Sequence, residues 1–123
     1  MLPRQHRLTR PEEYRQVLRG RGPQRRRAGN DLLVVHAAFA SADHSPTRPP
    51  RVGFVVSKAV GGSVVRNRVV RRLRALSAER LAEIPAGADL VIRAMPPAAQ
   101  ATSAELGAAL DRLLATVLPA GAR

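Results

Sequence analysis

The residues best suited to chemistry lie in the segment 51–74, which carries six arginines and Lys58 without one acidic residue. Guanidinium groups form paired hydrogen bonds to phosphate oxygens, and side chains three or four residues apart meet on one helix face. Arg68 stands at this spacing from both Arg71 and Arg72, and each such like-charge pair destabilises an isolated helix by about 0.2 to 0.5 kcal/mol. A ligand with closely spaced negative charges offsets that repulsion. The segment therefore predicts a binding surface for a polyanion, with nucleic acid as the first candidate.

A helix predicted over residues 64–83 separates this charge from an apolar face. At 100° per residue the aliphatic side chains share one arc, and Asn67, Arg68, Arg71, Arg72 and Arg74 share the other. We expect the first arc to enter the core and the second to meet the anion. The aliphatic arc comprises Val65, Val69, Val70, Leu73, Leu76, Leu81 and Ile84.

Gly61, Gly62 and Ser63 precede this helix. Free amide groups at a helix start bind anions, so these residues are one candidate phosphate site. A plain glycine turn in which Ser63 caps the helix explains them equally well.

The chain offers no conventional catalytic centre. His6, His36 and His44 are scattered without metal-ligand spacing, and there is no cysteine to serve as nucleophile or thiolate ligand. The only close acidic pairs are typical of helix starts and solvent-facing helix surfaces. If the protein takes part in catalysis, we expect another molecule to perform the reaction, and the sequence leaves any metal-binding residues unknown.

Charge and composition point to a single basic domain. The 123 residues carry a net charge of +12, and 45% of them are apolar, although only 2% are aromatic. Two blocks, 1–30 and 51–74, each carry +7, so the excess is concentrated. No stretch approaches the roughly 18 consecutive apolar residues of a membrane span. We therefore expect a soluble cytoplasmic protein with an aliphatic core, one domain over residues 1–118, and a short flexible tail at 119–123.

The pattern of apolar residues and turn formers predicts an α/β order. We expect helices over 10–19, 64–83 and 103–118, and strands over 32–39, 52–56 and 89–94. Residues 25–27 are assigned to a basic loop, and the Pro-rich segment 42–50 to a surface connection. The order is thus helix, two or three strands, helix, strand, helix.

The segment 51–74 reads RVGFVVSKAVGGSVVRNRVVRRLR. It resembles the signature of the bacterial ribonuclease P protein family: a strand ending in Ser57-Lys58, a glycine turn, and Arg66-Asn67-Arg68 at the head of a basic helix. The similarity continues in the N-terminal helix around Tyr14 and in the later strands. It covers most of residues 2–118, less closely after Pro97.

The resemblance implies a two-layer α/β sandwich in the order αβββαβα, with a small mixed sheet and a left-handed crossover around the basic helix. It also implies a function in tRNA processing. Proteins of this family bind a large catalytic RNA, which with Mg²⁺ hydrolyses the bond joining the 5′ leader to precursor tRNA. The Mg²⁺ is bound mainly through the RNA, and no obligate protein partner or membrane is implied.

Carried over by position, the resemblance places two sets of residues on RNA. The set facing the catalytic RNA is Lys58, Arg66, Asn67, Arg68, Arg71, Arg72 and Arg74. The set lining a cleft for the single-stranded leader is Tyr14, Leu18, Val34, His36 and Phe54. Leu18 and His36 stand where the family usually has aromatic residues, which leaves Tyr14 as the clear base-stacking side chain.

Three of the cleft residues also have a plain structural interpretation. Tyr14 could simply pack on the sheet, His36 could be an ordinary strand residue, and Phe54 could belong to the core. Two other functions fit the charge pattern: a structural RNA binder such as a small ribosomal protein, and a DNA-binding helix module.

Overall fold

The structure, a computed structural model, describes residues 2–19, 25–39 and 49–118. Most of the Pro-rich connection expected at 42–50, and all of the tail expected at 119–123, lie outside these residues. In the part described, no helix is long and apolar enough to cross a bilayer. In chain order the elements are η1 (Arg4–His6), α1 (Pro11–Arg19), β1 (Arg25–Gly29), β2 (Leu33–Ala38), β3 (Arg51–Val55), α2 (Ser63–Glu79), η2 (Leu81–Glu83), β4 (Asp89–Ala94), η3 (Pro96–Gln100) and α3 (Ser103–Val117).

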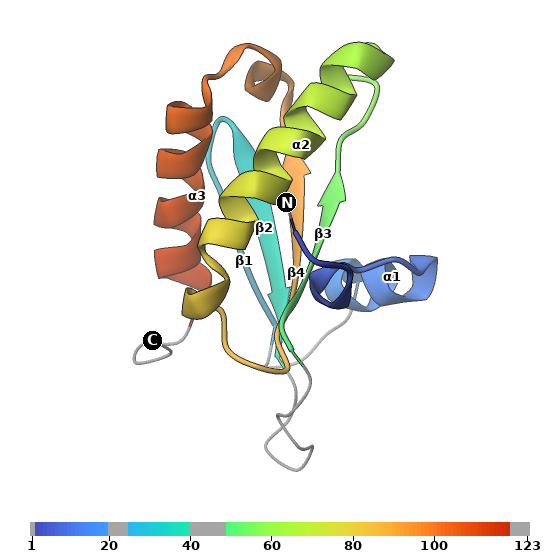
Figure 1. Cartoon of the computed structure of the whole chain (residues 1–123), viewed down its shortest axis with the longest axis vertical. Helices are drawn as coiled ribbons and strands as arrows, with labels where there is room; N and C mark the ends of the chain where they lie inside the picture. Colours follow the sequence, from blue (N-terminus) through green and yellow to red (C-terminus); the bar gives the residue numbers. More distant parts are fainter. Residues whose placement is uncertain (1, 20–24, 40–48, 119–123) are drawn as a thin grey trace.

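The four strands form one mixed sheet in the order β1-β2-β4-β3. The β1–β2 and β2–β4 pairs are antiparallel, whereas β3 and β4 are parallel. In Figure 1 the chain rises along β3, descends through α2 in front of the sheet, and rises again along β4 to the left of β3. This crossover is left-handed, which is rare for parallel strands. The αβββαβα order and the left-handed crossover implied by the resemblance are both confirmed.

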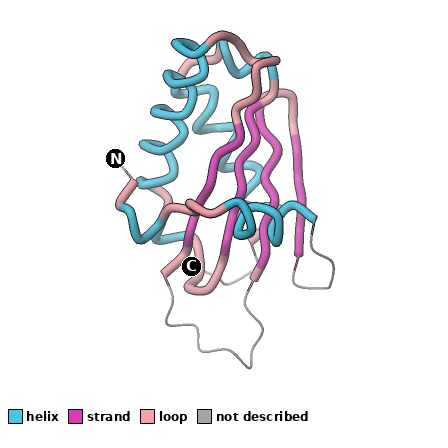
Figure 2. Tube along the Cα trace, turned by 90° about the vertical axis from the view of Figure 1, so that its right-hand side faces the viewer, coloured by secondary structure: helices cyan, strands magenta, loops and turns pink. Residues whose placement is uncertain are grey.

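The sheet separates two apolar layers, because alternate side chains of a strand point to opposite faces. Leu33, Val35 and Ala37 of β2 belong to the main core beneath α2 and α3. On the other face, α1 packs through Val17 against Val91 of β4. Figure 2 shows α2 and α3 on one side of the strands, while the short α1 crosses near one end of the sheet. Part of the α1 face is therefore left without a covering helix.

Helix α2 follows a glycine turn in which Gly61 leaves no room for a side chain. A β-carbon at Gly61, whose φ is +158°, would lie 2.9 Å from Cγ1 of Val65. Gly62 is the N-cap residue, and its carbonyl accepts from the Arg66 N–H at 2.9 Å. Ser63 is the first helical residue and makes no capping hydrogen bond, so the prediction that it caps the helix is wrong.

Three assignments differ from the sequence prediction. Residues 25–27 belong to an edge strand rather than a loop, because their backbone pairs with β2. Helix α2 ends at Glu79, and the expected final turn is the separate 3-10 turn η2. Val70 lies outside the core on the exposed side of α2, since the buried stripe of this helix is narrow and comprises Val69, Leu73 and Ser77.

Candidate nucleic-acid interface

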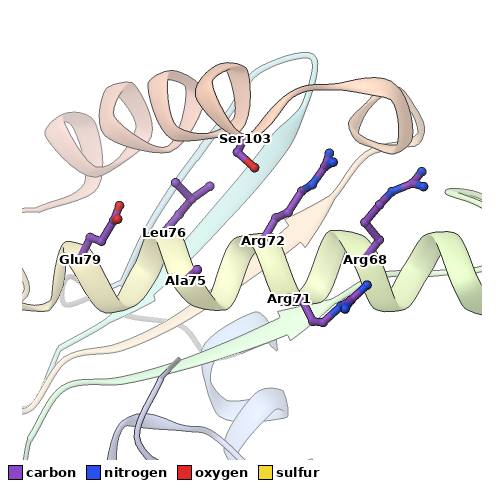
Figure 3. Close-up of a pocket in the computed structure, with 7 residues that line it drawn as sticks. All are labelled: Arg68, Arg71, Arg72, Ala75, Leu76, Glu79 and Ser103. Atoms are coloured by element: carbon purple, nitrogen blue, oxygen red, sulfur yellow. The ribbon is translucent and has the colours of Figure 1, made fainter.

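The arginines of α2 divide between two sides of the helix. Arg68 and Arg72 point toward the start of α3, whereas Arg71 points to the other side (Figure 3). Arg68 Nη2 donates to the carbonyl of Ala99 at 3.3 Å, and Arg72 Nη1 donates to the carbonyl of Ala101 at 2.8 Å. These two side chains thus hold the η3–α3 connection against α2, in addition to carrying charge.

The outer side of α2 forms an open hollow of about 600 Å³ that mixes aliphatic and cationic side chains. Val64 at its margin is 76% exposed, which is unusual for an aliphatic residue of this size in a small protein. Polar side chains surround it without any carboxylate. The hollow is lined by Val64, Asn67, Val70, Arg71 and Arg74.

The remaining predicted contacts with the catalytic RNA lie near the start of the same helix. Lys58 is exposed in the turn between β3 and α2, and Arg66 is half-buried in the first helical turns. The Nε atoms of Arg66 and Arg74 are shielded from solvent and have no hydrogen-bond partner among the described residues. The structure therefore brings all seven predicted side chains onto α2 and its leading turn.

Two arginines outside α2, Arg51 and Arg80, form ion pairs with carboxylates. Arg51 binds Asp89 at 2.9 Å and Glu13 at 2.5 Å, and Arg80 binds Asp111 at 2.6 Å. In both cases the carboxylates raise the pKa of the guanidinium, through hydrogen bonds first and charge second. In the three described ranges of the chain, Arg66, Arg68, Arg71, Arg72 and Arg74 have no carboxylate partner.

The second predicted surface lies on the α1 face of the sheet. Val34 and His36 of β2 alternate with the core residues, so they point to the side where α1 provides Tyr14 and Leu18. The phenol of Tyr14 donates to the carbonyl of Leu8 and accepts from the N–H of Phe54, both at 3.2 Å. Tyr14 thus fixes α1 to β3, as its structural interpretation expects.

Phe54 does not share this face. Its side chain packs against the main core beneath α2 and α3. Phe54 is paired in register with Ile92 of β4, whose side chain also lies in the main core. Partners in register point to the same face of a sheet, so this pairing agrees with the placement of Phe54. Its placement in the leader cleft is therefore wrong, and only its backbone N–H contacts Tyr14.

His36 occupies a cationic part of the face. It is half-buried, and its Nε2 atom is shielded without a hydrogen-bond partner in the described part of the chain. Burial lowers the pKa of His36 below its ordinary value of 6.5, and the nearby charges of Arg27 and Arg93 lower it further. The imidazole is therefore mainly neutral at pH 7.

Sequence reasoning missed Arg27 and Arg93 on this face. Arg27 lies directly opposite His36 on β1, and Arg93 opposes both Val34 and Val55. Both arginines are exposed. Side chains alternate between the two faces along β4, so the sequence of this strand could have placed Arg93 on the α1 face. The placement of Arg27 requires residues 25–27 to be recognised as a strand.

The described residues contain no group of three His, Cys, Asp or Glu side chains that could hold a metal ion. Glu13 and Asp89 share Arg51 between them and are thereby already paired with a cation. These donor residues therefore do not fit a protein-bound Mg²⁺.

Comparison with known proteins agrees with this geometry. The ribonuclease P family model matches residues 2–118. The ribonuclease P protein component of Streptomyces griseus is 50% identical over the full length of both chains. Two solved ribonuclease P proteins share the fold. The Staphylococcus aureus protein has a TM-score of 0.74 at 23% identity and covers 92% of this chain and 95% of its own. The Thermotoga maritima protein has a TM-score of 0.72 at 20% identity and covers 92% of this chain and 98% of its own.

These matches exclude the two alternatives of a ribosomal protein and a DNA-binding helix module, since a family model and full-length relatives agree on one assignment. The chain shares its overall fold with both solved structures. The chain belongs to the ribonuclease P protein family and is the protein subunit of that tRNA-processing endoribonuclease, whose partner is an RNA.

Proposed function

We propose that α2 and its leading turn dock on the RNA subunit of ribonuclease P. The single observation that carries this proposal is the set of guanidinium groups on α2 that no carboxylate neutralises in the described residues. Phosphates would neutralise them and relieve their mutual repulsion. The contacts are made by Lys58, Arg66, Asn67, Arg68, Arg71, Arg72 and Arg74.

Within this set the outward residues make the principal contacts. Asn67, Arg71 and Arg74 line the open hollow, where a phosphate and a ribose have room beside Val64. Arg68 and Arg72 each use one N–H on a backbone carbonyl, which leaves their other N–H groups for RNA at the margin of the surface.

The uncovered part of the α1 face holds the 5′ leader of precursor tRNA in this proposal. Tyr14, Leu18, Val34 and His36 line it, and the support is their common face together with the cations beside them. Leu18 and the Tyr14 ring supply an apolar wall. Because the phenol of Tyr14 is held by two hydrogen bonds, its ring contacts the leader from a fixed position.

The RNA subunit and its Mg²⁺ supply the hydrolysis of the phosphodiester. The protein residues bind the RNA subunit and orient the leader strand. No step is assigned to a metal held by protein side chains, since the described donors do not form such a site.

Reconstitution tests this function. The purified protein is added to its RNA subunit and a precursor tRNA at low Mg²⁺, and leader removal is followed over time. We expect a faster reaction than with RNA alone, at an unchanged cleavage position. Equal stimulation by an unrelated protein of the same charge would contradict the proposal, because charge alone would then explain the effect.

A further inference from the structure

The edge strand β1 carries three consecutive arginines that the function described above does not use. Arg25 donates to the carbonyl of Gln16 at the end of α1. The side chains of Arg26 and Arg27 are exposed and form no hydrogen bond or ion pair within the described ranges 2–19, 25–39 and 49–118. Arg26 opposes Ala37 of the main core and so points to the face of α2 and α3, whereas Arg27 points to the α1 face. These two guanidiniums are available for a ligand.

Strand geometry connects Arg27 to the proposed leader cleft. Arg27 opposes His36, which in turn opposes Val91 of β4, so all three side chains point to the α1 face. Arg93, two residues beyond Val91, points to the same face. The nearby positive charges of Arg27 and Arg93 reach the imidazole, since both act on its protonation. A cationic path thus crosses the sheet from β4 to β1.

Among the strands that the structure describes, none pairs with the outer edge of β1. Such an edge has unpaired N–H and C=O groups, and it can receive another strand or a different ligand. A second copy of this chain would place its own arginines against Arg26 and Arg27, which disfavours edge-to-edge pairing. A negatively charged ligand is favoured instead. Single-stranded RNA provides both negative charge and hydrogen-bond acceptors.

We propose that Arg27 at the β1 edge, together with Arg93, forms a second contact for single-stranded RNA, namely the upstream part of the leader. This inference rests on the proposed leader cleft. The strands β4, β2 and β1, spaced about 4.8 Å apart, make a path about 10 Å wide, so a leader that crosses it must extend beyond the nucleotides next to the cleavage site. Guanidinium N–H groups bind the phosphates as the strand leaves over β1.

The test compares leader lengths in the reconstituted holoenzyme. Precursors with leaders of about two and about ten nucleotides are used, because grooves that follow a single strand typically contact four or more nucleotides. For the combined Arg27→Ala and Arg93→Ala variant we expect roughly tenfold weaker binding of the long-leader precursor at low salt. Loss of two single-strand phosphate contacts also reduces the slope of log affinity against log salt by about 1.4.

Arg112→Ala is the matched control, because Arg112 is an exposed arginine on α3, away from the sheet face. We expect this variant to bind both precursors like the original protein. Circular dichroism and thermal unfolding of each variant check that the fold is retained.

The outcomes are distinguishable. An equal loss for short and long leaders, or no loss for either, would overturn the β1 contact while leaving the proposed function intact. Failure of the unmodified protein to bind the leader or to stimulate the RNA subunit would instead overturn the proposed function. Self-association that disappears in the double variant would assign the β1 edge to a second copy of the chain and would overturn the RNA contact.

Discussion

The ring of Tyr14 lies directly against the backbone of Gly53, so that a β-carbon at this glycine would come within 2.6 Å of ring atoms Cε2 and Cζ. This close approach lets the phenol reach between Leu8 and Phe54. Helix α1, which forms one wall of the proposed leader cleft, is thereby seated on β3.

Gly53→Ala should therefore displace Tyr14 and loosen α1. We expect unfolding free energy to fall by about 1 to 3 kcal/mol, as in other overpacked sites, with weaker leader binding. Chemical denaturation and leader affinity are the measurements. Tyr14→Phe is the companion variant: it keeps the ring but removes the hydroxyl, and should cost about 1 kcal/mol. Full stability in Gly53→Ala would show that the ring can move freely.

The two sides of α2 should respond differently to equal losses of charge. The double variant with Arg71→Ala and Arg74→Ala removes two outward cations, so its affinity for the RNA subunit should fall. The slope of log affinity against log salt concentration should become shallower by about 1.4 to 1.8. Thermal stability should hardly change.

Arg68→Ala with Arg72→Ala removes the same charge but also the bonds to Ala99 and Ala101. We expect it to lower the unfolding free energy by about 1 to 3 kcal/mol, because two backbone carbonyls lose their partners. Binding titrations at several salt concentrations and denaturation curves separate the effects. Identical behaviour of the two pairs would refute the division between the sides.

Lowering the pH should weaken the attachment of α1, because the carboxylate of Glu13 then becomes protonated. The backbone N–H groups of Arg10 and Thr9 donate to its carboxylate, and with the charge of Arg51 they hold the pKa of Glu13 below its ordinary 4.5. The folded state therefore favours the ionised form. Its stabilising contribution is complete above about pH 4.5 and is lost as the pH falls through the lowered pKa.

Glu13→Gln should lower the unfolding free energy at pH 7 by about 1 kcal/mol and reduce the acid sensitivity of unfolding. Glu12→Gln, a change at the neighbouring exposed residue, is the control. Unfolding curves from pH 7 to pH 3 provide the measurement. If both variants lose stability in parallel with the original protein as the pH falls, Glu13 is not the group responsible.

RNA on the α1 face should raise the pKa of His36. In the free protein the pKa is below 6.5 because of burial and of the charges on Arg27 and Arg93. Below pH 6.5 this depressed pKa opposes folding, since the unfolded chain takes up the proton more readily. Phosphates placed beside the two arginines would cancel their effect, so RNA binding should be accompanied by proton uptake below pH 6.5.

Histidine NMR signals, followed through a pH titration with and without a leader oligonucleotide, measure this change. His6, whose Nδ1 lies 2.8 Å from the carbonyl of Pro50, serves as an internal reference, since it lies in η1 and not on β2. A pKa of His36 that is unchanged by bound leader would place the RNA elsewhere.

Much of the proposed interface with the RNA subunit could be predicted from the sequence. Val69 and Leu73 are buried and Arg71 is exposed, as the helical period requires, because neighbours three and four residues apart share a face in any α-helix. The clustering of basic residues in 51–74 predicted a polyanionic ligand, and this prediction too used only residues that are close together in the sequence. The motif around Arg66, Asn67 and Arg68 resembled one family, and the full-length matches confirmed it.

Only the tertiary structure decided which of these charges stay unpaired. Arg51 belongs to the basic segment, yet Glu13 and Asp89, each 38 residues away, neutralise it. Arg72 meets a carbonyl 29 residues further along the chain. Strand register likewise sends Phe54 to the core and places Arg27 beside His36. Local periodicity assigns a side chain to a face of its own element, but its partners depend on how distant elements pack, and a single short stretch of chain does not contain that information.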